Sequence, residues 1–326
     1  MRRNLVLVHD PGYQALGDMQ EIQAEVRVFH SEIDVHIAFN SLDNNRLNRR
    51  LTAAPTLVVS FTQLKRYQPS RGRIYQGKWI AKTRQISVLA EHGISVPKTQ
   101  LLTPDLVADP GEWGEIVLVK PALPVSTFGK GVNLIRTAQL RYITPADYPE
   151  DHPGRQGPML VQEFINTGPL PSQYRVLTLL GAPLYCRKLL RDEGEVRTDV
   201  DDAELAAMPV ATAVGPPIHS ERSDEANVLE LASAASAALG DVPLQGMDIV
   251  REQRTGRLYV LELNPGGNTW HFSSVLGEPI KKAIGERLGA TGKEAEKRGR
   301  EELLKQFDAF KRAAAVLAER TERDAE

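Results

Sequence analysis

The chain has 326 residues, of which 41% are hydrophobic and 25% are charged, values that are ordinary for a globular protein. The formal net charge is −2 at pH 7, which excludes a global basic field for nucleic acid or membranes. Cys186 is the only cysteine, so an internal disulfide is excluded and a reducing compartment is indicated. The length of the chain is enough for two or three packed units. No apolar run approaches the roughly 18 residues that would cross a membrane, so we expect a cytoplasmic protein.

The first sixty residues alternate between predicted strands and helices. Strands are predicted at Asn4–Val8, Asp34–Phe39 and Thr56–Phe61, and helices at Asp18–Phe29 and Leu42–Leu51. This order predicts a small open α/β unit with parallel strands. The unit has no Gly-x-Gly-x-x-Gly pattern, so we do not expect a dinucleotide site there. The polar and basic stretch Tyr67–Tyr75 is predicted to connect domains.

The middle of the chain predicts further strands and two helices. A helix is predicted over Trp79–Glu91, which Gly93 and Pro97 would end. Strands are predicted over Val117–Pro121, Met159–Ile165, Tyr174–Leu180 and Pro183–Leu190, with the last two pairing antiparallel around Gly181 and Ala182. We expect a polar loop over Asp192–Val214 and an alanine-rich helix over Ser223–Leu239.

Two helices are predicted at the end of the chain, over Ile280–Leu288 and Glu294–Glu319. The second carries an apolar stripe of Leu303, Phe307, Phe310, Ala314 and Leu317. We expect this stripe to pack on the body of the protein. Contact between two copies of the chain in a homo-oligomer is the alternative.

The stretch from Gln245 to Asn268 predicts a hairpin with one apolar and one acidic face. Two β-rich runs, Met247–Val250 and Leu258–Leu263, flank a three-residue loop that ends in Gly256. That loop would pair Gln253 with Arg257 and place Asp248 directly opposite Glu262. Because side chains alternate along a strand, Asn264 shares the face of Glu262. The apolar face would carry Met247, Ile249, Leu261 and Leu263.

Two opposed carboxylates should repel one another if they are left bare. A divalent cation would relieve that repulsion. Oxygen ligands suit Mg²⁺ or Mn²⁺, with water and phosphate oxygens completing the coordination shell. The alternative is a solvent-exposed hairpin face on which the acids pair with Arg251 or Arg257.

A second candidate feature is the loop that follows the predicted strand Val117–Pro121. It spans Val125 to Val132 and contains small hydroxyl residues, two glycines and a lysine. Such loops cover phosphate groups by presenting backbone N–H groups to them.

In this order, the motifs resemble those of the ATP-grasp superfamily, and within it the branch of ribosomal-protein glutamate ligases and ATP-grasp glutathione synthetases. The resemblance covers about Lys78 to Leu276. The matched residues are Lys82, Lys120 in V-L-V-K-P-A, the loop Ser126–Val132, the hinge V-Q-E-F-I, Arg175, Arg197, Asp248 in G-M-D-I, and Glu262 with Asn264 in L-E-L-N-P.

The resemblance implies an α/β (α+β) fold in which two β-sheet lobes clamp ATP. A Rossmann-like pre-ATP-grasp domain would precede the lobes and occupy residues 1–77. The central lobe would span 78–160, and the C-terminal lobe with the metal site would span 161–290. Residues 291–326 would form a C-terminal amphipathic helix.

The resemblance also implies which residues hold ATP and the metal. The ATP phosphates would be bound by Lys82 and Lys120 and covered by Ser126, Thr127, Gly129 and Gly131. The adenine would contact Gln162, Glu163 and Ile165, largely through backbone groups. One or two Mg²⁺ (or Mn²⁺) ions would be held by Asp248, Glu262 and Asn264.

Three arginines are candidates for the chemistry. Arg197 would face the transferred phosphoryl group, and its alternative role is a surface pair with Asp199 or Glu195. Arg187 is a further candidate for the same task. Arg175 would bind substrate or pair structurally.

The sequence departs from the family in several places. Phe128 stands in the phosphate loop where relatives have a small residue, and Leu189 stands near the usual place of an arginine. No acid follows the hinge to hold the ribose, so Gln173 or Ser172 would substitute. Trp270 and His271 are expected near the substrate end, where His271 is an acid/base candidate or a structural residue.

The implied function is that of an ATP-dependent carboxylate–amine ligase. It would form an amide or peptide bond through an acyl phosphate and release ADP and phosphate. Its partners would be a small-molecule or peptide carboxylate and an amine acceptor, with no nucleic acid or membrane. The alternatives are a kinase of the same fold that phosphorylates a small molecule, and a non-catalytic ATP-binding scaffold or regulatory protein.

Overall fold

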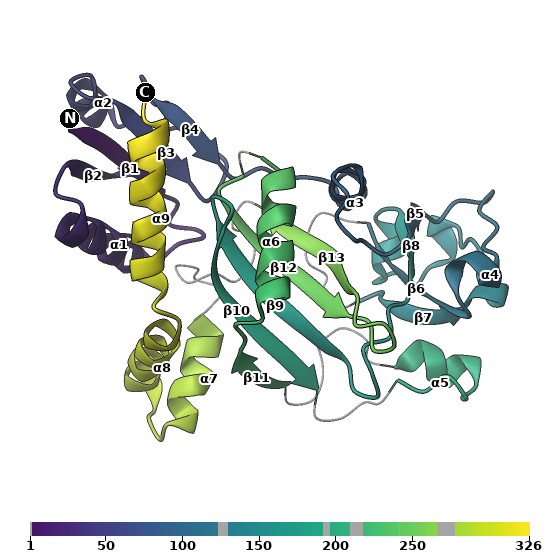
Figure 1. The fold of residues 1–326 in the computed structure, drawn as a ribbon. Helices are drawn as coiled ribbons and strands as arrows, with labels where there is room; N and C mark the ends of the chain where they lie inside the picture. Colours follow the sequence, from purple (N-terminus) through teal and green to yellow (C-terminus); the bar gives the residue numbers. More distant parts are fainter. Residues whose placement is uncertain (1, 123–129, 192–195, 209–217, 241, 266–277) are drawn as a thin grey trace.

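The computed structural model spans all 326 residues and describes them apart from residues 1, 123–129, 192–195, 209–217, 241 and 266–277. The described residues contain three β-sheets, which Figure 1 shows side by side along the molecule with helices packed on their faces. Over these residues, no helix is both long and apolar enough to cross a membrane.

The first sheet is parallel and has the strand order β2-β1-β3-β4. Its strands are β1 (Arg3–His9), β2 (Ile33–Phe39), β3 (Thr56–Ser60) and β4 (Arg73–Gln76). The sheet is buried on both faces, since Leu5 and Leu7 pack toward α1 (Leu16–Phe29) and Val6 packs toward α2 (Asn45–Leu51). Burial on both faces explains why β1 and β3 are almost continuously apolar.

The parallel α/β unit that the sequence predicts is therefore present, with one correction. The stretch Tyr67–Tyr75 was predicted as a connection between domains, but its end belongs to β4, which pairs in parallel with β3. The sequence R-I-Y-Q is too short and too polar to show the strand pattern. Pairing with an existing strand edge supplies the hydrogen bonds that this short segment needs.

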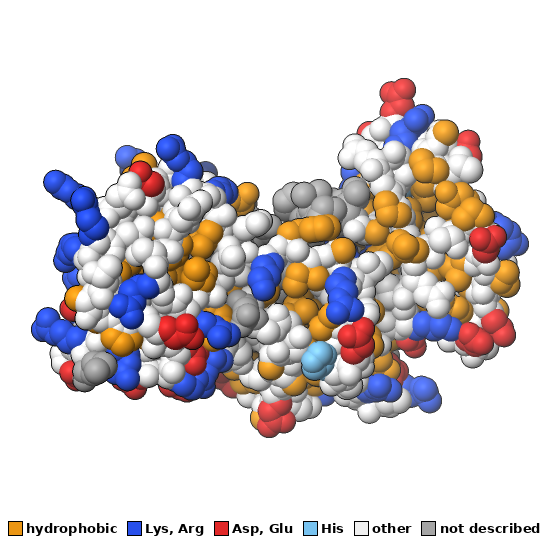
Figure 2. Space-filling model, turned by 90° about the horizontal axis from the view of Figure 1, so that it is seen from above, with side chains coloured by type: hydrophobic (Ala, Val, Ile, Leu, Met, Phe, Trp, Pro, Cys, Tyr) orange, Lys and Arg blue, Asp and Glu red, His pale blue; other side chains and the backbone are white. Residues whose placement is uncertain are grey.

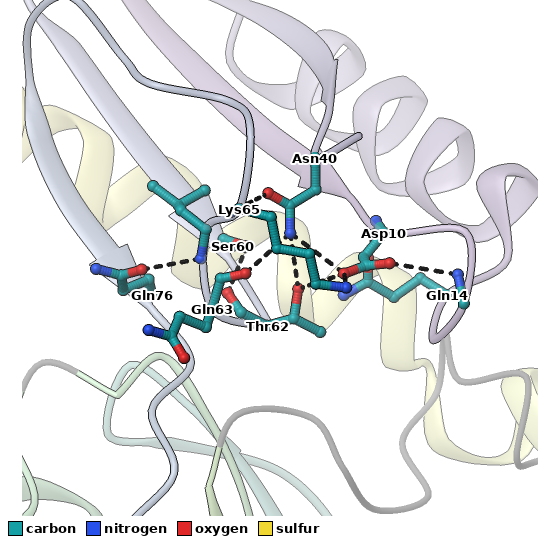
Figure 3. Close-up of polar contacts among 10 residues, drawn as sticks. Asp10, Gln14, Asn40, Ser60, Thr62, Gln63, Lys65 and Gln76 are labelled. Carbon is teal, nitrogen blue, oxygen red and sulfur yellow. Dashed lines mark hydrogen bonds and ion pairs between the residues drawn. The ribbon is translucent and has the colours of Figure 1, made fainter. Parts of the chain in front are cut away.

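A polar network ties together the loops at the carboxyl edge of this sheet (Figure 3). The carboxylate of Asp10 accepts hydrogen bonds from Asn40 and Thr62, each at 3.2 Å, and pairs with Lys65 at 2.8 Å. Burial alone would raise the pKa of Asp10, but the hydrogen bonds from Lys65 and Asn40 hold it below its ordinary value. The network joins residues that follow three different strands, so it fixes these loops to one another.

The second sheet is antiparallel and has the order β5-β8-β6-β7. Its strands are β5 (Thr99–Leu101), β6 (Ile116–Pro121), β7 (Asn133–Arg136) and β8 (Met159–Glu163), and α4 (Pro110–Trp113) packs beside them. Three short 3₁₀ turns lie between β7 and β8, at Thr137–Gln139, Pro145–Asp147 and Pro153–Arg155. The helix α3 (Lys82–Glu91) precedes this sheet in the chain. In Figure 2 this lobe stands at the right, and basic and acidic side chains are interspersed over the face shown.

The third sheet is antiparallel and has the order β11-β10-β9-β12-β13. Its strands are β9 (Ser172–Leu179), β10 (Ala182–Arg191), β11 (Ile218–Arg222), β12 (Leu244–Arg251) and β13 (Leu258–Pro265). The helix α6 (Ala226–Ala238) covers one face of it, as Figure 1 shows, and packs on Val176, Cys186 and Met247. The opposite face is therefore left for the site.

Two further expectations about this region have clear outcomes. The predicted antiparallel pair around Gly181 is confirmed, and the turn is formed by Leu180 and Gly181, both at positive φ. Such a two-residue turn matches the twist of the flanking strands. The predicted loop Asp192–Val214 is wrong in part, because α5 (Asp202–Ala207) lies within it, capped by the Asp201 side chain.

The end of the chain forms α7 (Glu278–Arg287), α8 (Gly292–Phe307) and α9 (Ala309–Asp324). The single helix predicted over Glu294–Glu319 is thus two helices, broken at Asp308, which has a left-handed φ of 51°. The helix α9 lies across the first sheet (Figure 1), and its buried residues include Ala314 and Leu317. This part of the stripe therefore packs on the body of the chain, as expected. The division of the chain into four domains stays a prediction.

The helical pair α7–α8 is joined to α1 by a buried ion cluster. Asp18 on α1 is 1% exposed and pairs with Arg300 of α8. The ammonium group of Lys281 on α7, which is fully buried, lies 3.8 Å from the same carboxylate. A buried carboxylate needs such cations close by, so this contact fixes where α7 and α8 dock.

We expect Gly299→Ala to destabilise the chain, because α7 and α8 cross at Gly285 and Gly299. A Cβ at Gly299 would lie 1.5 Å from the carbonyl oxygen of Lys281, so the two helices would have to separate. The expected loss is about 1–3 kcal/mol, as for other overpacked sites. Gly17→Ala in α1 is the matched control, since nothing lies within 4 Å of its Cβ. Urea unfolding of both variants tests this, and equal midpoints would contradict it.

Candidate nucleotide and metal site

The hairpin β12–β13 places Asp248 directly opposite Glu262, as the sequence predicts. The register near the loop differs from the prediction, because Glu252, and not Gln253, pairs with Arg257 through a backbone hydrogen bond of 2.9 Å. A β-bulge between Asp248 and Ile249 takes up the difference. The predicted acidic pair is therefore confirmed, although the predicted turn register is wrong.

The bulge also changes which side chains face the core. Val260 is buried with Met247, Ile249 and Leu263 against α6. Leu261, which the sequence placed on that apolar face, lines the site instead. The bulge adds one residue to β13. The side chains between the loop and the bulge therefore point to the face opposite to the one that strict alternation predicts.

Each carboxylate of the pair has a cationic partner from another element. Asp248 lies 2.9 Å from Nε of Arg175 on β9 and accepts a 3.2 Å hydrogen bond from Gln173. Glu262 lies 3.2 Å from Nζ of Lys82, the first residue of α3. The partners suggested as an alternative are wrong: Arg251 pairs with Glu225, and Arg257 donates to Ser95.

The helix α3 is held against β13 by a backbone contact. The side-chain oxygen of Gln85 accepts a 3.1 Å hydrogen bond from the backbone N–H of Leu263, and the Gln85 amide nitrogen donates to Ile80. Gln85 is 4% exposed, so these bonds are shielded from water. They fix the start of α3, and with it Lys82, beside Glu262.

The electrostatics of Asp248 fit a site that takes a cation. Burial raises the pKa of Asp248 above its ordinary value, Arg175 opposes this in part, and Glu262 adds to the increase. Over the described ranges, no group of three or more His, Cys, Asp and Glu side chains could hold a metal ion. The predicted donor set is two carboxylates and the amide of Asn264, which lies opposite Gly246. Mg²⁺ commonly takes one or two carboxylates and completes its shell with water and phosphate oxygens, so these residues fit it.

A buried lysine of the second sheet lies beside Glu262. Lys120 on β6 is 9% exposed and donates a 2.9 Å hydrogen bond to Gln162, whose amide donates to Thr99 at 2.8 Å. Burial lowers the pKa of Lys120 to about 8, while Glu262 raises it in part. Lys82, Lys120, Gln162 and Glu262 line one small cavity between the second and third sheets.

A larger cavity of about 80 Å³ adjoins it and shares Gln162 and Leu261 with it. Its walls are mostly apolar and come from strands of both sheets and from the segments that follow β8 and β10: Leu118, Phe164, Ile165, Val196, Val250 and Leu261. Polar groups at its rim include Glu163, Ser172 and Gln173. Apolar walls with a few polar groups at one edge suit a flat heteroaromatic ring.

The chain is similar to several solved structures. They include D-cycloserine synthetase DcsG (16% identity, TM-score 0.47, covering 98% of this chain and 99% of that chain) and the ATP-grasp ligase PsnB complexed with minimal precursor, Mg and ADP (16%, 0.44, 82% and 89%). Another is the D-alanine–D-alanine ligase from Bacillus anthracis (13%, 0.40, 98% and 99%). The chain is similar to ATP-grasp ligases. No family model and no curated protein matches the sequence.

The predicted positions other than Asn264, Arg187 and Arg197 fall into three groups. Those that meet at the two cavities or at the acidic pair are Lys82, Lys120, Gln162, Glu163, Ile165, Arg175, Asp248 and Glu262. Gly131 has a left-handed φ of 75° beside His152. Ser126, Thr127, Gly129, Trp270 and His271 lie outside the described residues.

The three candidate arginines are placed differently. Arg175 and Arg187 are opposite each other on β9 and β10. Arg197 is half-exposed and pairs with Asp199 at 3.3 Å, which is the alternative given for it. An ATP-grasp role of Arg197 toward a phosphoryl group stays a prediction.

Sequence reasoning missed Arg191. It ends β10, is fully buried, and donates its backbone N–H to Pro171 at the rim of the larger cavity. The resemblance to the ATP-grasp family implies an arginine at about Leu189. The available signal was spacing, because Arg191 lies four residues after Arg187 on one strand and so faces the same side.

Proposed function

We propose that this chain is an ATP-dependent carboxylate–amine ligase that works through an acyl phosphate. What carries the proposal is the acidic pair Asp248 and Glu262, opposed in register, with Glu262 lining a cavity that also receives the buried Lys120. Acids and lysines meeting beside an apolar slot are what a metal–nucleotide complex requires. The base would occupy the cavity lined by Ile165 and Leu261.

In this function the side chains bind and neutralise charge. Lys120 and Lys82 would hold phosphate oxygens, and Arg175 and Arg187 would neutralise charge on the phosphoryl group in transfer. Asp248, Glu262 and Asn264 would hold Mg²⁺, which supplies charge neutralisation of the phosphates when bound. Binding of that complex would release Arg175 and Lys82 from the acids that they pair with here.

The reaction would proceed in two steps. A carboxylate oxygen attacks the γ-phosphorus of ATP, a new O–P bond forms, and ADP leaves with the electrons of the broken bond. An amine nitrogen then attacks the acyl carbon, phosphate leaves, and the amine loses a proton to solvent. Neither step needs a protein nucleophile, because phosphoryl transfer depends mainly on positioning and charge.

We expect Mg-ATP to stabilise the chain against thermal unfolding, since a ligand that binds only the native state must do so. At a hundred times its dissociation constant, it adds about 2.7 kcal/mol. The measurement is a thermal shift with Mg-ATP, with ATP plus EDTA, and with Mg²⁺ alone. A chain that melts at one temperature under all three conditions would contradict a nucleotide site.

Turnover separates the ligase from its alternatives. A screen over pairs of carboxylates and amines should release ADP and phosphate and form an amide. ADP without free phosphate would instead indicate a kinase, and AMP with pyrophosphate would reject the acyl phosphate. Binding without turnover over the whole panel would favour an ATP-binding scaffold.

A further inference from the structure

The segment 196–208, which we call the strap, follows β10 of the third sheet in the chain but packs on the second sheet. It contains α5, which Figure 1 shows beside β7. Three side chains of the strap and two from β6 and β7 form one buried apolar cluster: Val200, Leu205, Met208, Ile116 and Leu134. The strap therefore links the two sheets between which the candidate site lies.

The same apolar cluster is continuous with a wall of the larger cavity. Leu118, Phe164 and Val196 pack against the cluster and also line that cavity. The backbone N–H of Val196 donates a 3.1 Å hydrogen bond to the carbonyl oxygen of Pro169, in a segment whose Pro171 lines the cavity too. Docking of the strap on the second sheet therefore completes one wall of the cavity.

Arg136, on β7, bonds to the strap at three points. Its guanidinium group donates to the carbonyl oxygens of Thr198 and Val200, at 3.1 and 2.6 Å, and to the carboxylate of Asp202 at 3.0 Å. A planar guanidinium group presents its donors in a fixed geometry, so it can hold several acceptors in place at once. Arg136 itself lines neither of the two cavities that the described residues form. Its contacts instead fix the turn between Val196 and α5 against β7.

The docking of the strap depends on these bonds to different extents. The ion pair of Arg136 with Asp202 is partly open to water, since the two side chains are 32% and 50% exposed, and such a pair contributes little by itself. Val200 is 9% exposed, so loss of the bond to its carbonyl oxygen would leave an acceptor unpaired beside the apolar cluster. Removal of the guanidinium group should therefore shift the strap away from its docked position.

We propose that Arg136 is a positioning residue for the base of the nucleotide, because it holds the strap, and with it Val196, against the second sheet. This inference rests on the proposed function, which assigns the larger cavity to the base. The proposed phosphate ligands Lys82 and Lys120 lie on α3 and β6, outside the strap. Loss of Arg136 should therefore weaken the binding of the base and leave the binding of the phosphates in place.

The test compares Mg-ATP with Mg-tripolyphosphate, which carries the phosphates without the base, by titration calorimetry on the full chain. Arg136→Met should weaken Mg-ATP binding roughly tenfold, the effect expected when about one chain in ten has the strap docked. Binding of Mg-tripolyphosphate should stay within about twofold. Arg136→Lys should restore part of the Mg-ATP affinity, because it keeps one charged donor. Arg141→Met is the matched control, since Arg141 donates to the carbonyl oxygens of Ala138 and Leu140 and not to the strap.

Asp202→Asn tests the same contact from the side of the strap, and it provides the test if Arg136→Met does not fold. Asp202 is exposed, so the fold should tolerate the change. We expect a smaller loss of Mg-ATP affinity, about twofold to threefold, and no further loss when the change is added to Arg136→Met, because Asp202 acts through Arg136. Hydrogen exchange in the free chain should be faster over residues 196–208 in Arg136→Met and unchanged over β12 and β13.

Two results would overturn the inference alone. One is unchanged Mg-ATP affinity in both Arg136→Met and Asp202→Asn. The other is an equal loss of affinity for Mg-ATP and Mg-tripolyphosphate, because the strap would then act on the phosphates, for instance through Arg197. If the unaltered chain binds neither probe, the proposed function falls and this inference falls with it.

Discussion

Asp248→Asn is expected to lower the rate of Mg-ATP-dependent phosphate release by about a hundredfold or more, while the chain stays folded. The change keeps the shape of the side chain but removes the charge that opposes Glu262 across the hairpin. Loss of one preorganised electrostatic group has effects of this size in other enzymes. The amide can still accept the hydrogen bond from Gln173, so the fold should tolerate the change.

The same variant separates a metal site from a structural ion pair. If Asp248 holds Mg²⁺, the Mg-ATP thermal shift should fall toward the shift that ATP gives with EDTA. If Asp248 only pairs with Arg175, the variant should lose stability without ligand and keep its full Mg-ATP shift. Glu230→Gln is the matched control, because Glu230 is exposed on α6, on the opposite face of the sheet. An unchanged rate in Asp248→Asn would reject the metal role of this carboxylate.

Lys120→Met is expected to stabilise the free chain and to weaken Mg-ATP binding. Folding lowers the pKa of Lys120 from 10.5 to about 8, which corresponds to a penalty of about 3 kcal/mol for the buried charge at pH 7. Lys120→Met removes this penalty, but it also loses the hydrogen bond to Gln162, which costs about 1 kcal/mol of stability. The free energy of unfolding should therefore increase by about 2 kcal/mol, which urea unfolding measures.

The pH dependence gives the sign of this effect independently. Below about pH 8 the lysine is charged in both the folded and the unfolded chain, so the whole penalty is present. Between about 8 and 10.5 the folded chain loses this proton first, and stability rises with pH. The advantage of Lys120→Met should therefore shrink from pH 7 to pH 10. A variant less stable than the unaltered chain at pH 7 would contradict the buried-charge account.

Nucleotide affinity should change with pH in the opposite sense. Phosphate binding needs the charged ammonium group, so the affinity of the unaltered chain for Mg-ATP should fall above about pH 8. Lys120→Met has no ammonium group at this position and should lack that fall. Titrations of both chains at pH 7 and 9 measure the difference. A Lys120→Met variant that is more stable but binds Mg-ATP more weakly is the result expected for a residue that is retained for function.

Local pattern predicted those parts of the site that depend on a single segment. The opposition of Asp248 and Glu262 was predicted from two apolar runs joined by a short loop, because hairpin partners are close in sequence, and the bulge preserves it although the loop is one residue longer than predicted. The parallel first unit follows from alternating strands and helices. Lys120 was matched through the resemblance of V-L-V-K-P-A to an ATP-grasp motif, and the structure finds it buried.

Only the tertiary structure decided which residues from distant segments meet the acidic pair. Lys82 reaches Glu262 from a helix 180 residues earlier, and Arg175 reaches Asp248 because β12 pairs with β9. The pairing of β10 with β9 and β11 also places Arg187 between Arg175 and Arg222. Strand order and long-range ion pairs depend on packing between segments, and periodicity within one segment carries no information about that packing. The bulge at Leu261 also depends on packing between segments. β12 pairs with β9 as well as with β13, and the bulge makes the four-residue turn compatible with both pairings.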